Sequence, residues 1–186
     1  QAGARLGQDV SYRLLSYRGD DGLARAGVCV ADRVYDAAAL AGRPQYGSVL
    51  GVLDDWPRAA ATLAEFAGSP RGDARALAAT TLLAPVLYPG AIYCAGANYT
   101  DHMEEMSAVM GLPRERDPHE AGLKPWHFLK TSRGSVVGPG VDVRMPAYGK
   151  LLDWEIELAA VIGRPCRDVP TERAHEYVAG YTIAND

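Results

Sequence analysis

The stretch LLDWEIELAAVIGRP, residues 151–165, contains the clearest predicted β-strand in this sequence. From residue 153 to residue 162 the side chains alternate in character, which is typical of a β-strand whose two faces meet different surroundings. The acidic face carries Asp153, Glu155 and Glu157. The opposite face carries Trp154, Ile156 and Leu158. A second strand is expected over residues 178–184, after a short helix that begins at residues 170–172.

Residues 12–82 predict a small α+β unit. Three apolar stretches separated by turn residues are expected to form an antiparallel meander over residues 12–17, 23–30 and 33–36. The Gly-Asp-Asp-Gly cluster at residues 19–22 supplies the first turn. An alanine-rich helix over about residues 56–66, capped by Asp54 or Asp55, and a shorter helix from Asp73 toward Leu82 complete the unit.

A segment with two prolines and a glycine, residues 84–90, is expected to be an extended linker. We therefore predict a small N-terminal domain over residues 1–85 and a second domain over residues 86–186. The second domain should begin with a short buried strand, AIYCAGA, and a helix that Thr100 or Asp101 caps and that ends near Met110. Further strands are expected at WHFLK (residues 126–130) and VDVRM (residues 141–145), after a long loop over residues 111–125.

The composition excludes several classes of protein. The 186 residues include 19 Lys and Arg against 23 Asp and Glu, and the net charge of −4 argues against a nucleic-acid partner, which normally needs a basic surface. No uncharged apolar run approaches the roughly 18 to 20 residues of a membrane-spanning helix. The first ten residues, QAGARLGQDV, lack the apolar core of a signal peptide. We therefore expect a cytoplasmic protein with no membrane partner.

The acidic strand face is the first candidate for chemistry. Carboxylates two residues apart on a strand are near neighbours, and their mutual repulsion is costly unless a cation lies between them. Asp186, at the end of the strand YTIAN, could complete a three-carboxylate site with Glu155 and Glu157. Oxygen ligands favour Mg²⁺, Mn²⁺ or Ca²⁺ over zinc. Spacing alone favours the alternative, a solvated acidic face on an amphipathic edge strand.

The second candidate is the pair His102 and Glu105. Residues three apart on a helix share a face, so Glu105 could orient His102 as a general base. A surface histidine and glutamate near a helix start is the alternative. Lys130, at the end of WHFLK, could hold a substrate carboxylate or could be an ordinary exposed lysine.

Four stretches in this order resemble the fumarylacetoacetate hydrolase family: YCAGANYTDHMEEM, PWHFLKTSRGSVVGPG, LLDWEIELAAVIGRPCRDVP and YVAGYTIAND. In the N-terminal part, RAGVCVADRVYDAA resembles the small first domain of the bacterial members. The resemblance implies an α+β protein in which this small antiparallel-strand and helix domain precedes the first part of a mixed β-roll catalytic domain. It also implies one divalent cation, Mg²⁺ or Mn²⁺, with Ca²⁺ as a further occupant in a crystal.

The resemblance also implies roles for particular residues. The metal ligands of the family correspond to Glu155, Glu157 and Asp186. The histidine of the family's NYxxH motif and the glutamate three residues later correspond to His102 and Glu105, on a helix that covers the site. Tyr99 of the same motif corresponds to a position that contacts the substrate, and Lys130 corresponds to a lysine that is either structural or in contact with the substrate. Members of the family commonly form homodimers, which we expect of the full-length protein.

Family members continue for roughly a hundred residues, about half a domain, beyond the position of Asp186. We therefore expect residues 1–186 to be a truncated sequence or a fragment of a longer protein. We also expect this piece alone to be inactive or prone to aggregation, because strands of the β-roll would stay unpaired.

The resemblance implies a metal-dependent hydrolase that cleaves a C–C bond in an acylpyruvate, a small keto acid of the fumarylacetoacetate or fumarylpyruvate type. The presence of both His102 and Glu105 favours hydrolysis, because they provide an activator for water. The alternative on the same metal site is an isomerase or decarboxylase acting on 2-hydroxy-hepta-2,4-diene-1,7-dioate or oxaloacetate-type acids. A third hypothesis from another class is a metal-binding module without catalytic activity.

Overall fold

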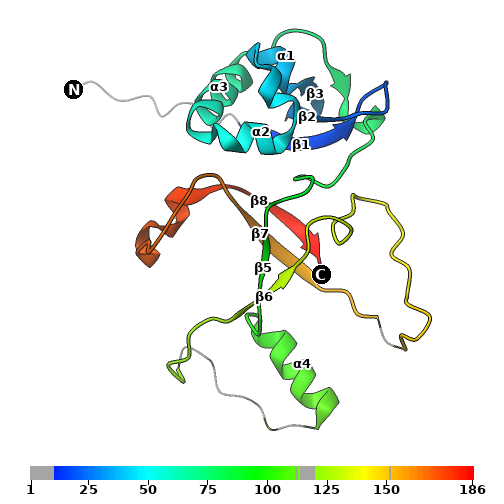
Figure 1. Cartoon of the computed structure of the whole chain (residues 1–186), viewed down its shortest axis with the longest axis vertical. Helices are drawn as coiled ribbons and strands as arrows, with labels where there is room; N and C mark the ends of the chain where they lie inside the picture. Colours follow the sequence, from blue (N-terminus) through cyan, green and yellow to red (C-terminus); the bar gives the residue numbers. More distant parts are fainter. Residues whose placement is uncertain (1–10, 112, 114–119, 151) are drawn as a thin grey trace. The chain divides into compact units, whose positions relative to one another are not determined.

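The computed structural model describes residues 11–111, 113, 120–150 and 152–186 and has a mixed α+β fold (Figure 1). Its contacts divide the chain into two compact units. One contains Gln1–Leu87 and Val137–Asp186, and the other contains Tyr88–Val136. The predicted domain boundary after residue 85 stays a prediction. Within the described part of the chain, no helix is long and apolar enough to cross a membrane.

The N-terminal part of the first unit is built on a four-stranded antiparallel sheet in the order β1-β2-β3-β4. The strands are β1 (Arg13–Arg18), β2 (Ala24–Val30), β3 (Arg33–Asp36) and β4 (Arg75–Ala76). The predicted three-strand meander is therefore confirmed. The helix predicted from Asp73 is wrong, because residues 75–76 pair with β3 and only a short 3₁₀ turn, η2 (Leu77–Ala79), follows.

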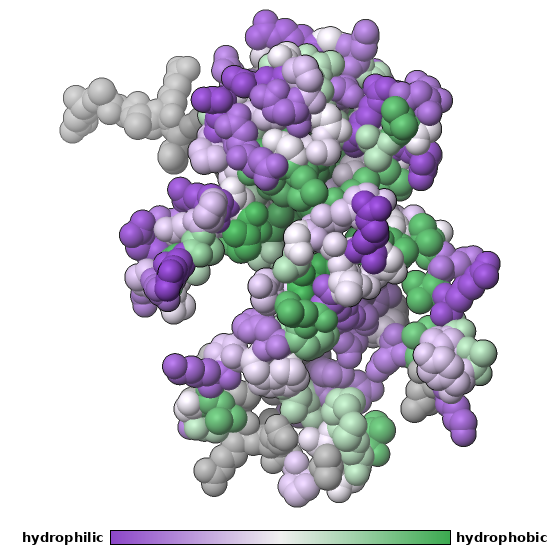
Figure 2. Space-filling model, viewed as in Figure 1, coloured by the Kyte–Doolittle hydropathy of each residue, from purple (hydrophilic) through white to green (hydrophobic). Residues whose placement is uncertain are grey.

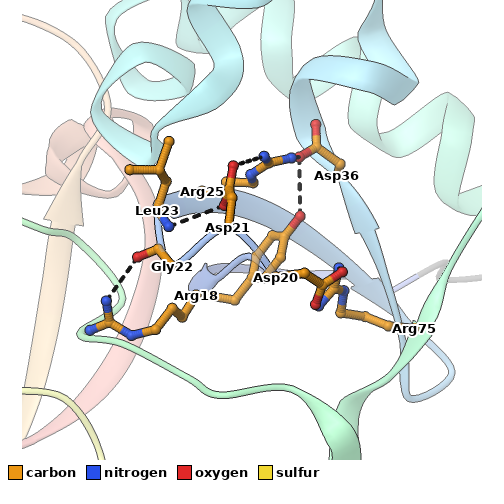
Figure 3. A network of polar contacts seen from close by, with 9 residues as sticks. Arg18, Asp20, Asp21, Gly22, Leu23, Arg25, Asp36 and Arg75 are labelled. Carbon is orange, nitrogen blue, oxygen red and sulfur yellow. Dashed lines mark hydrogen bonds and ion pairs between the residues drawn. The ribbon is translucent and has the colours of Figure 1, made fainter.

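A polar network surrounds the turn between β1 and β2 (Figure 3). The predicted Gly19–Gly22 turn is confirmed, and Gly22 adopts a φ of +81°, which favours glycine. Asp21 accepts hydrogen bonds from the backbone N–H of Leu23 and from Arg25, and these bonds lower the pKa of its carboxyl group. Arg75 forms two hydrogen bonds with Asp20, at 3.1 and 3.2 Å, and so attaches the short β4 to this turn.

Helices α1 (Ala37–Ala41), α2 (Val49–Asp54) and α3 (Trp56–Gly68) pack with the sheet, and a 3₁₀ turn, η1 (Pro44–Gly47), lies between α1 and α2. The prediction of α3 is confirmed, and Asp55 is its cap residue, although the Asp55 side chain makes no capping hydrogen bond. Helices α1 and α2 were not predicted. Both are short, and each begins with a side-chain cap. Asp36 Oδ1 accepts from Ala39 N–H, and Ser48 Oγ accepts from Gly51 N–H.

The core of this part contains side chains from strands and helices. Its fully buried members are Ala26, Val28, Ala37, Tyr46, Val49, Val52, Ala59 and Leu63. The residues after β4 also attach to the sheet, since Arg18 N–H donates to Thr81 O at 3.0 Å and Leu83 N–H donates to Ser16 O at 2.9 Å. Ser16 Oγ donates to Pro85 O at 2.9 Å. The first residues of the predicted linker are therefore held against β1.

Tyr46 provides a test of this core. Its side chain is completely buried, and its hydroxyl donates to Asp55 Oδ2 at 2.8 Å. Burial, and then the bond to Asp55, raise the pKa of Tyr46. We expect Tyr46→Phe to lower the free energy of unfolding by about 1–2 kcal/mol, because Asp55 loses the hydrogen bond from the buried hydroxyl and keeps only the longer contact with Arg58. Urea denaturation measures this loss, and Tyr148→Phe at a 91% exposed site is the control. An equal, small effect of both substitutions would contradict the role of this bond.

The second unit contains β5 (Ile92–Ala95), α4 (Thr100–Met110) and β6 (His127–Lys130). β5 and β6 form an antiparallel pair. Their positions confirm the two predicted strands and the predicted helix. The predicted burial of the first strand is wrong, because Tyr93 is 70% exposed and the other residues of β5 are half-buried. The predicted cap is wrong by one residue, because Tyr99 is the N-cap and makes no side-chain capping bond. Part of the predicted loop over residues 111–125 lies outside the described residues.

The C-terminal part of the first unit contains β7 (Ile156–Ile162), the 3₁₀ helix η3 (Thr171–Tyr177) and β8 (Val178–Asn185). The strand predicted from Asp153 begins three residues later, and the predicted second strand and the short helix before it are confirmed. The strand predicted at residues 141–145 is wrong, because this segment has no regular structure. Alternating apolar residues form a strand only where another strand offers hydrogen bonds.

Candidate functional site

The three carboxylates predicted to bind a metal lie at the end of the β7–β8 hairpin. The last paired residues are Ile156 and Asn185. The backbone N–H of Asp186 donates to Glu155 O at 2.8 Å and extends the pairing by one residue. Since opposed residues share a face of an antiparallel pair, Glu155 and Asp186 are neighbours on one face. Glu157 lies two residues along on that same face.

The two faces of the hairpin differ in exposure in an unexpected direction. Glu155, Glu157 and Asp186 are half-buried. The apolar side chains of the other face are exposed, by 67% for Ile156, 63% for Leu158 and 75% for Ile183. Figure 2 shows that hydrophobic residues reach the surface at several places on this face of the molecule. The carboxylates are therefore on the more covered face, in contrast to the solvated acidic face that was the alternative.

The donor set fits a hard divalent cation. All three side chains offer oxygen, and Cβ atoms of directly opposed residues are about 5 Å apart, which is within reach of one ion for carboxylate side chains. Within residues 11–111, 113, 120–150 and 152–186, no three His, Cys, Asp or Glu side chains are already gathered to hold a metal. The structure thus brings the ligands to one face and one hairpin end but does not close their side chains around a point.

His102 and Glu105 lie on α4 in the second unit. They are three residues apart and so share one side of the helix. His102 is half-buried and Glu105 is exposed. Asp101 stands in the first turn of α4, where its negative charge interacts favourably with the helix dipole, and its side chain accepts from the His102 backbone N–H at 2.9 Å. The helix therefore carries the imidazole and the carboxylate on one side.

The two residues predicted to contact a substrate also belong to the second unit. Tyr99 is the N-cap residue of α4, and its side chain is 37% exposed. Lys130 is the last residue of β6, opposite Ile92, and its Nζ lies 6.0 Å from the centre of the Phe128 ring. Both side chains lie at ends of regular elements, where polar groups can reach a ligand.

The turn between β5 and α4 contains two features that sequence reasoning missed. Gly96 N–H donates to Trp126 O at 3.0 Å, and a Cβ on Gly96 would overlap the Trp126 ring, so a larger residue here would require the ring to move. Ala97 has a φ of +54°, a left-handed conformation that costs energy for a residue with a side chain. No composition or spacing signal marks Ala97. The bend it makes directs the chain into Tyr99 and α4.

A third missed residue is Asn185. Its side-chain Oδ1 accepts a hydrogen bond from Glu155 N–H at 3.0 Å. The only signal in the sequence is its position directly before Asp186. The carboxylates and Asn185 belong to one unit, and the α4 residues and Lys130 belong to the other.

Comparisons with known proteins place these residues in context. Protein Rv2993c of Mycobacterium tuberculosis is 41% identical over 110 residues, which cover 59% of this chain and 37% of that protein. The human mitochondrial oxaloacetate tautomerase FAHD2B is 38% identical over 106 residues, covering 57% of this chain and 30% of that protein.

The structure of maleylpyruvate hydrolase from Sphingobium sp. SYK-6, in complex with manganese(II) and pyruvate, has a TM-score of 0.66 and 26% identity. That match covers 94% of this chain and 58% of the solved chain. The present chain therefore spans roughly a third of the length of these curated relatives and a little over half of the solved protein.

A family model supports the same relationship. The model of the fumarylacetoacetate (FAA) hydrolase C-terminal domain matches residues 91–186, more than half of the chain. This range includes α4, the β5–β6 pair, the β7–β8 hairpin and all the predicted site residues. On the strength of this match the chain belongs to the fumarylacetoacetate hydrolase family.

Proposed function

We propose that the protein containing this chain is a divalent-metal-dependent hydrolase that cleaves a C–C bond in acylpyruvate-type 1,3-diketo acids. The observation that carries the proposal is the backbone bond between Glu155 and Asp186 across the β7–β8 hairpin, with Glu157 on the same face. A solved relative that bears manganese and pyruvate supports a metal and a keto acid as ligands. A homodimer and a cytoplasmic location stay predictions.

Glu155, Glu157 and Asp186 would hold the cation, Mg²⁺ or Mn²⁺ in solution and Ca²⁺ as a further occupant in a crystal. When bound, such a cation acts as a Lewis acid that stabilises negative charge on substrate oxygen atoms. The half-burial of the three side chains favours this role, since partly excluded water strengthens electrostatic interactions.

His102 is the proposed general base. Its imidazole takes a proton from water, the hydroxyl oxygen adds to the acyl carbonyl carbon, and the bond between that carbon and the adjacent methylene breaks. The acyl part leaves as a carboxylic acid. The methylene carbon takes up a proton and becomes the methyl group of pyruvate. Glu105, one helical turn from His102, stabilises the imidazolium and sets the orientation of the ring.

Lys130 and Tyr99 are the proposed substrate-binding residues. An ammonium group attracts the terminal carboxylate of a keto acid, and a phenol can donate to one of its oxygens. The Lys130 ammonium lies 6.0 Å from the centre of the Phe128 ring, where the attraction between the two is weak, so the group can turn to a ligand.

The second candidate is an isomerase, tautomerase or decarboxylase on the same carboxylate face, acting on dienedioate or oxaloacetate-type acids. The similarity to a human oxaloacetate tautomerase, 38% identical over the matched region, favours it. Both reactions need stabilisation of an enolate, but only hydrolysis needs activated water. A metal-binding module without turnover is the third candidate, and turnover of any of these acids excludes it.

His102→Ala separates the two enzymes. We expect pyruvate release from acylpyruvates to fall about 100-fold or more, because the general base is lost, while metal-dependent conversion of oxaloacetate survives. The measurement is ultraviolet loss of acylpyruvate with coupled detection of pyruvate, on the full-length protein with Mg²⁺ or Mn²⁺. His175→Ala, at an exposed position on η3, is the matched control. If no acylpyruvate is cleaved but oxaloacetate or a dienedioate is converted, the second candidate replaces the hydrolase.

A further inference from the structure

The end of the β7–β8 hairpin departs from a regular antiparallel ladder. In such a ladder, two directly opposed residues of a hydrogen-bonded pair exchange both backbone bonds. Here Asp186 N–H donates to Glu155 O at 2.8 Å, as expected for such a pair. The return bond from Glu155 N–H goes to a side chain instead, the Oδ1 of Asn185 at 3.0 Å.

The side-chain bond from Glu155 N–H to Asn185 helps to fix the backbone at two of the three carboxylates. Glu155 lies one residue before β7 begins, and Asp186 follows β8 directly. Hydrogen bonds to the backbone of a residue hold it in register with its neighbours. Both backbone groups of Glu155 therefore have a partner: its N–H donates to Asn185 Oδ1, and its carbonyl accepts from Asp186 N–H. The Glu155 side chain is thereby held on the same face as Glu157 and beside Asp186.

We infer that Asn185 is a positioning residue that holds the Glu155 backbone in register with Asp186 for cation binding. This inference rests on the proposed metal site. The register places Asn185 opposite Ile156, on the face away from the carboxylates. It therefore acts through the backbone of Glu155 and is not itself a ligand. A site for a divalent cation requires its ligands to be held close to their final geometry, and partners behind the ligands set that geometry.

The chemistry of asparagine suits this task. An amide oxygen accepts from a backbone N–H without adding a fourth negative charge beside three carboxylates. The side chain is short, so it can bond to a residue on the neighbouring strand with little loss of conformational freedom. Leucine has nearly the same shape but no acceptor, and aspartate keeps an acceptor oxygen but offers no N–H.

The test is Mn²⁺ affinity, measured from the electron paramagnetic resonance signal of free Mn²⁺ in titrations of the full-length protein. We expect Asn185→Leu to weaken Mn²⁺ binding by about tenfold or more, and Asn185→Asp to stay within about threefold of the parent protein or to bind more tightly. Thr182→Val, on the carboxylate face but away from the hairpin end, is the matched control and should not change the affinity. Thermal unfolding without metal checks that each variant is folded.

The outcomes separate this inference from the proposed function. If the parent protein binds no Mn²⁺, or if Glu155→Gln leaves the affinity unchanged, both are overturned. If Glu155→Gln weakens binding but Asn185→Leu does not, the metal site stands and the role of Asn185 is wrong. If Asn185→Leu and Asn185→Asp weaken binding equally, acceptance by Oδ1 is not the cause and the inference fails. Rescue by Asn185→Asp alone supports it.

Discussion

Glu155→Gln is expected to abolish metal-dependent pyruvate release and to weaken Mn²⁺ binding about 100-fold or more. The substitution keeps the size of the side chain and the hydrogen bonds of the Glu155 backbone with Asn185 and Asp186. It removes one negative charge from a face whose only other proposed ligands are Glu157 and Asp186. Because a divalent cation is held chiefly by carboxylate charge, loss of one of three carboxylates should dominate every other single change at the hairpin.

The measurements are turnover of acylpyruvates and titration of Mn²⁺ for the same protein preparation. Glu172→Gln is the matched control, because Glu172 is an exposed glutamate in the first turn of η3, between β7 and β8. It removes the same charge from the same part of the chain. If the two substitutions weaken Mn²⁺ binding and turnover equally, the change in net charge explains the effect and Glu155 has no special role as a ligand. Full activity of Glu155→Gln would remove the carboxylate face from the proposed mechanism.

Gly51→Ala is expected to lower the free energy of unfolding by about 3 kcal/mol or more. A Cβ at this position would overlap the carbonyl oxygen of Gln45, far inside van der Waals contact. The obstacle is backbone, so it cannot rotate away as a side chain would. Gln45 belongs to η1 beside the buried Tyr46, and Gly51 lies in α2 between the buried residues Val49 and Val52. Relief of the clash must therefore disturb the core.

The matched control for this prediction is Gly47→Ala. Gly47 lies in the same region, at the end of η1, and a Cβ there meets no atom within 4 Å. Loss of glycine flexibility in the unfolded chain should leave this variant neutral or slightly more stable. Urea denaturation followed by circular dichroism compares the two. A similar stability for both variants would show that η1 and α2 can separate without disturbing the core.

Local patterns in the sequence were sufficient for several elements. The alternation around Glu155 and Glu157 predicted a strand and the common face of the two carboxylates, because side-chain direction in a strand depends only on its own backbone. The turn at Gly19–Gly22 and the alanine-rich α3 were also predicted correctly. The spacing of His102 and Glu105 predicted that they share one side of a helix, and their positions on α4 confirm this. The family resemblance supplied the proposed roles of these residues.

Other features depended on contacts between distant residues. A helix was predicted after Asp73, yet Arg75 and Ala76 pair with β3, and pairing with a distant strand outweighs local helix preference. VDVRM has the pattern of a strand but no strand partner among the described residues, so it stays irregular. The short helices α1 and α2 have weak propensity of their own and are stabilised by packing on the core.

The sequence by itself determined the faces of single elements, because periodicity is a property of one segment. Only the tertiary structure decided which segments meet. The register of β7 with β8 brought Glu155 beside Asp186, 31 positions along the chain, and gave Asn185 a bond to the Glu155 backbone. Such pairings depend on hydrogen bonds and packing across long sequence separations, which no local pattern records.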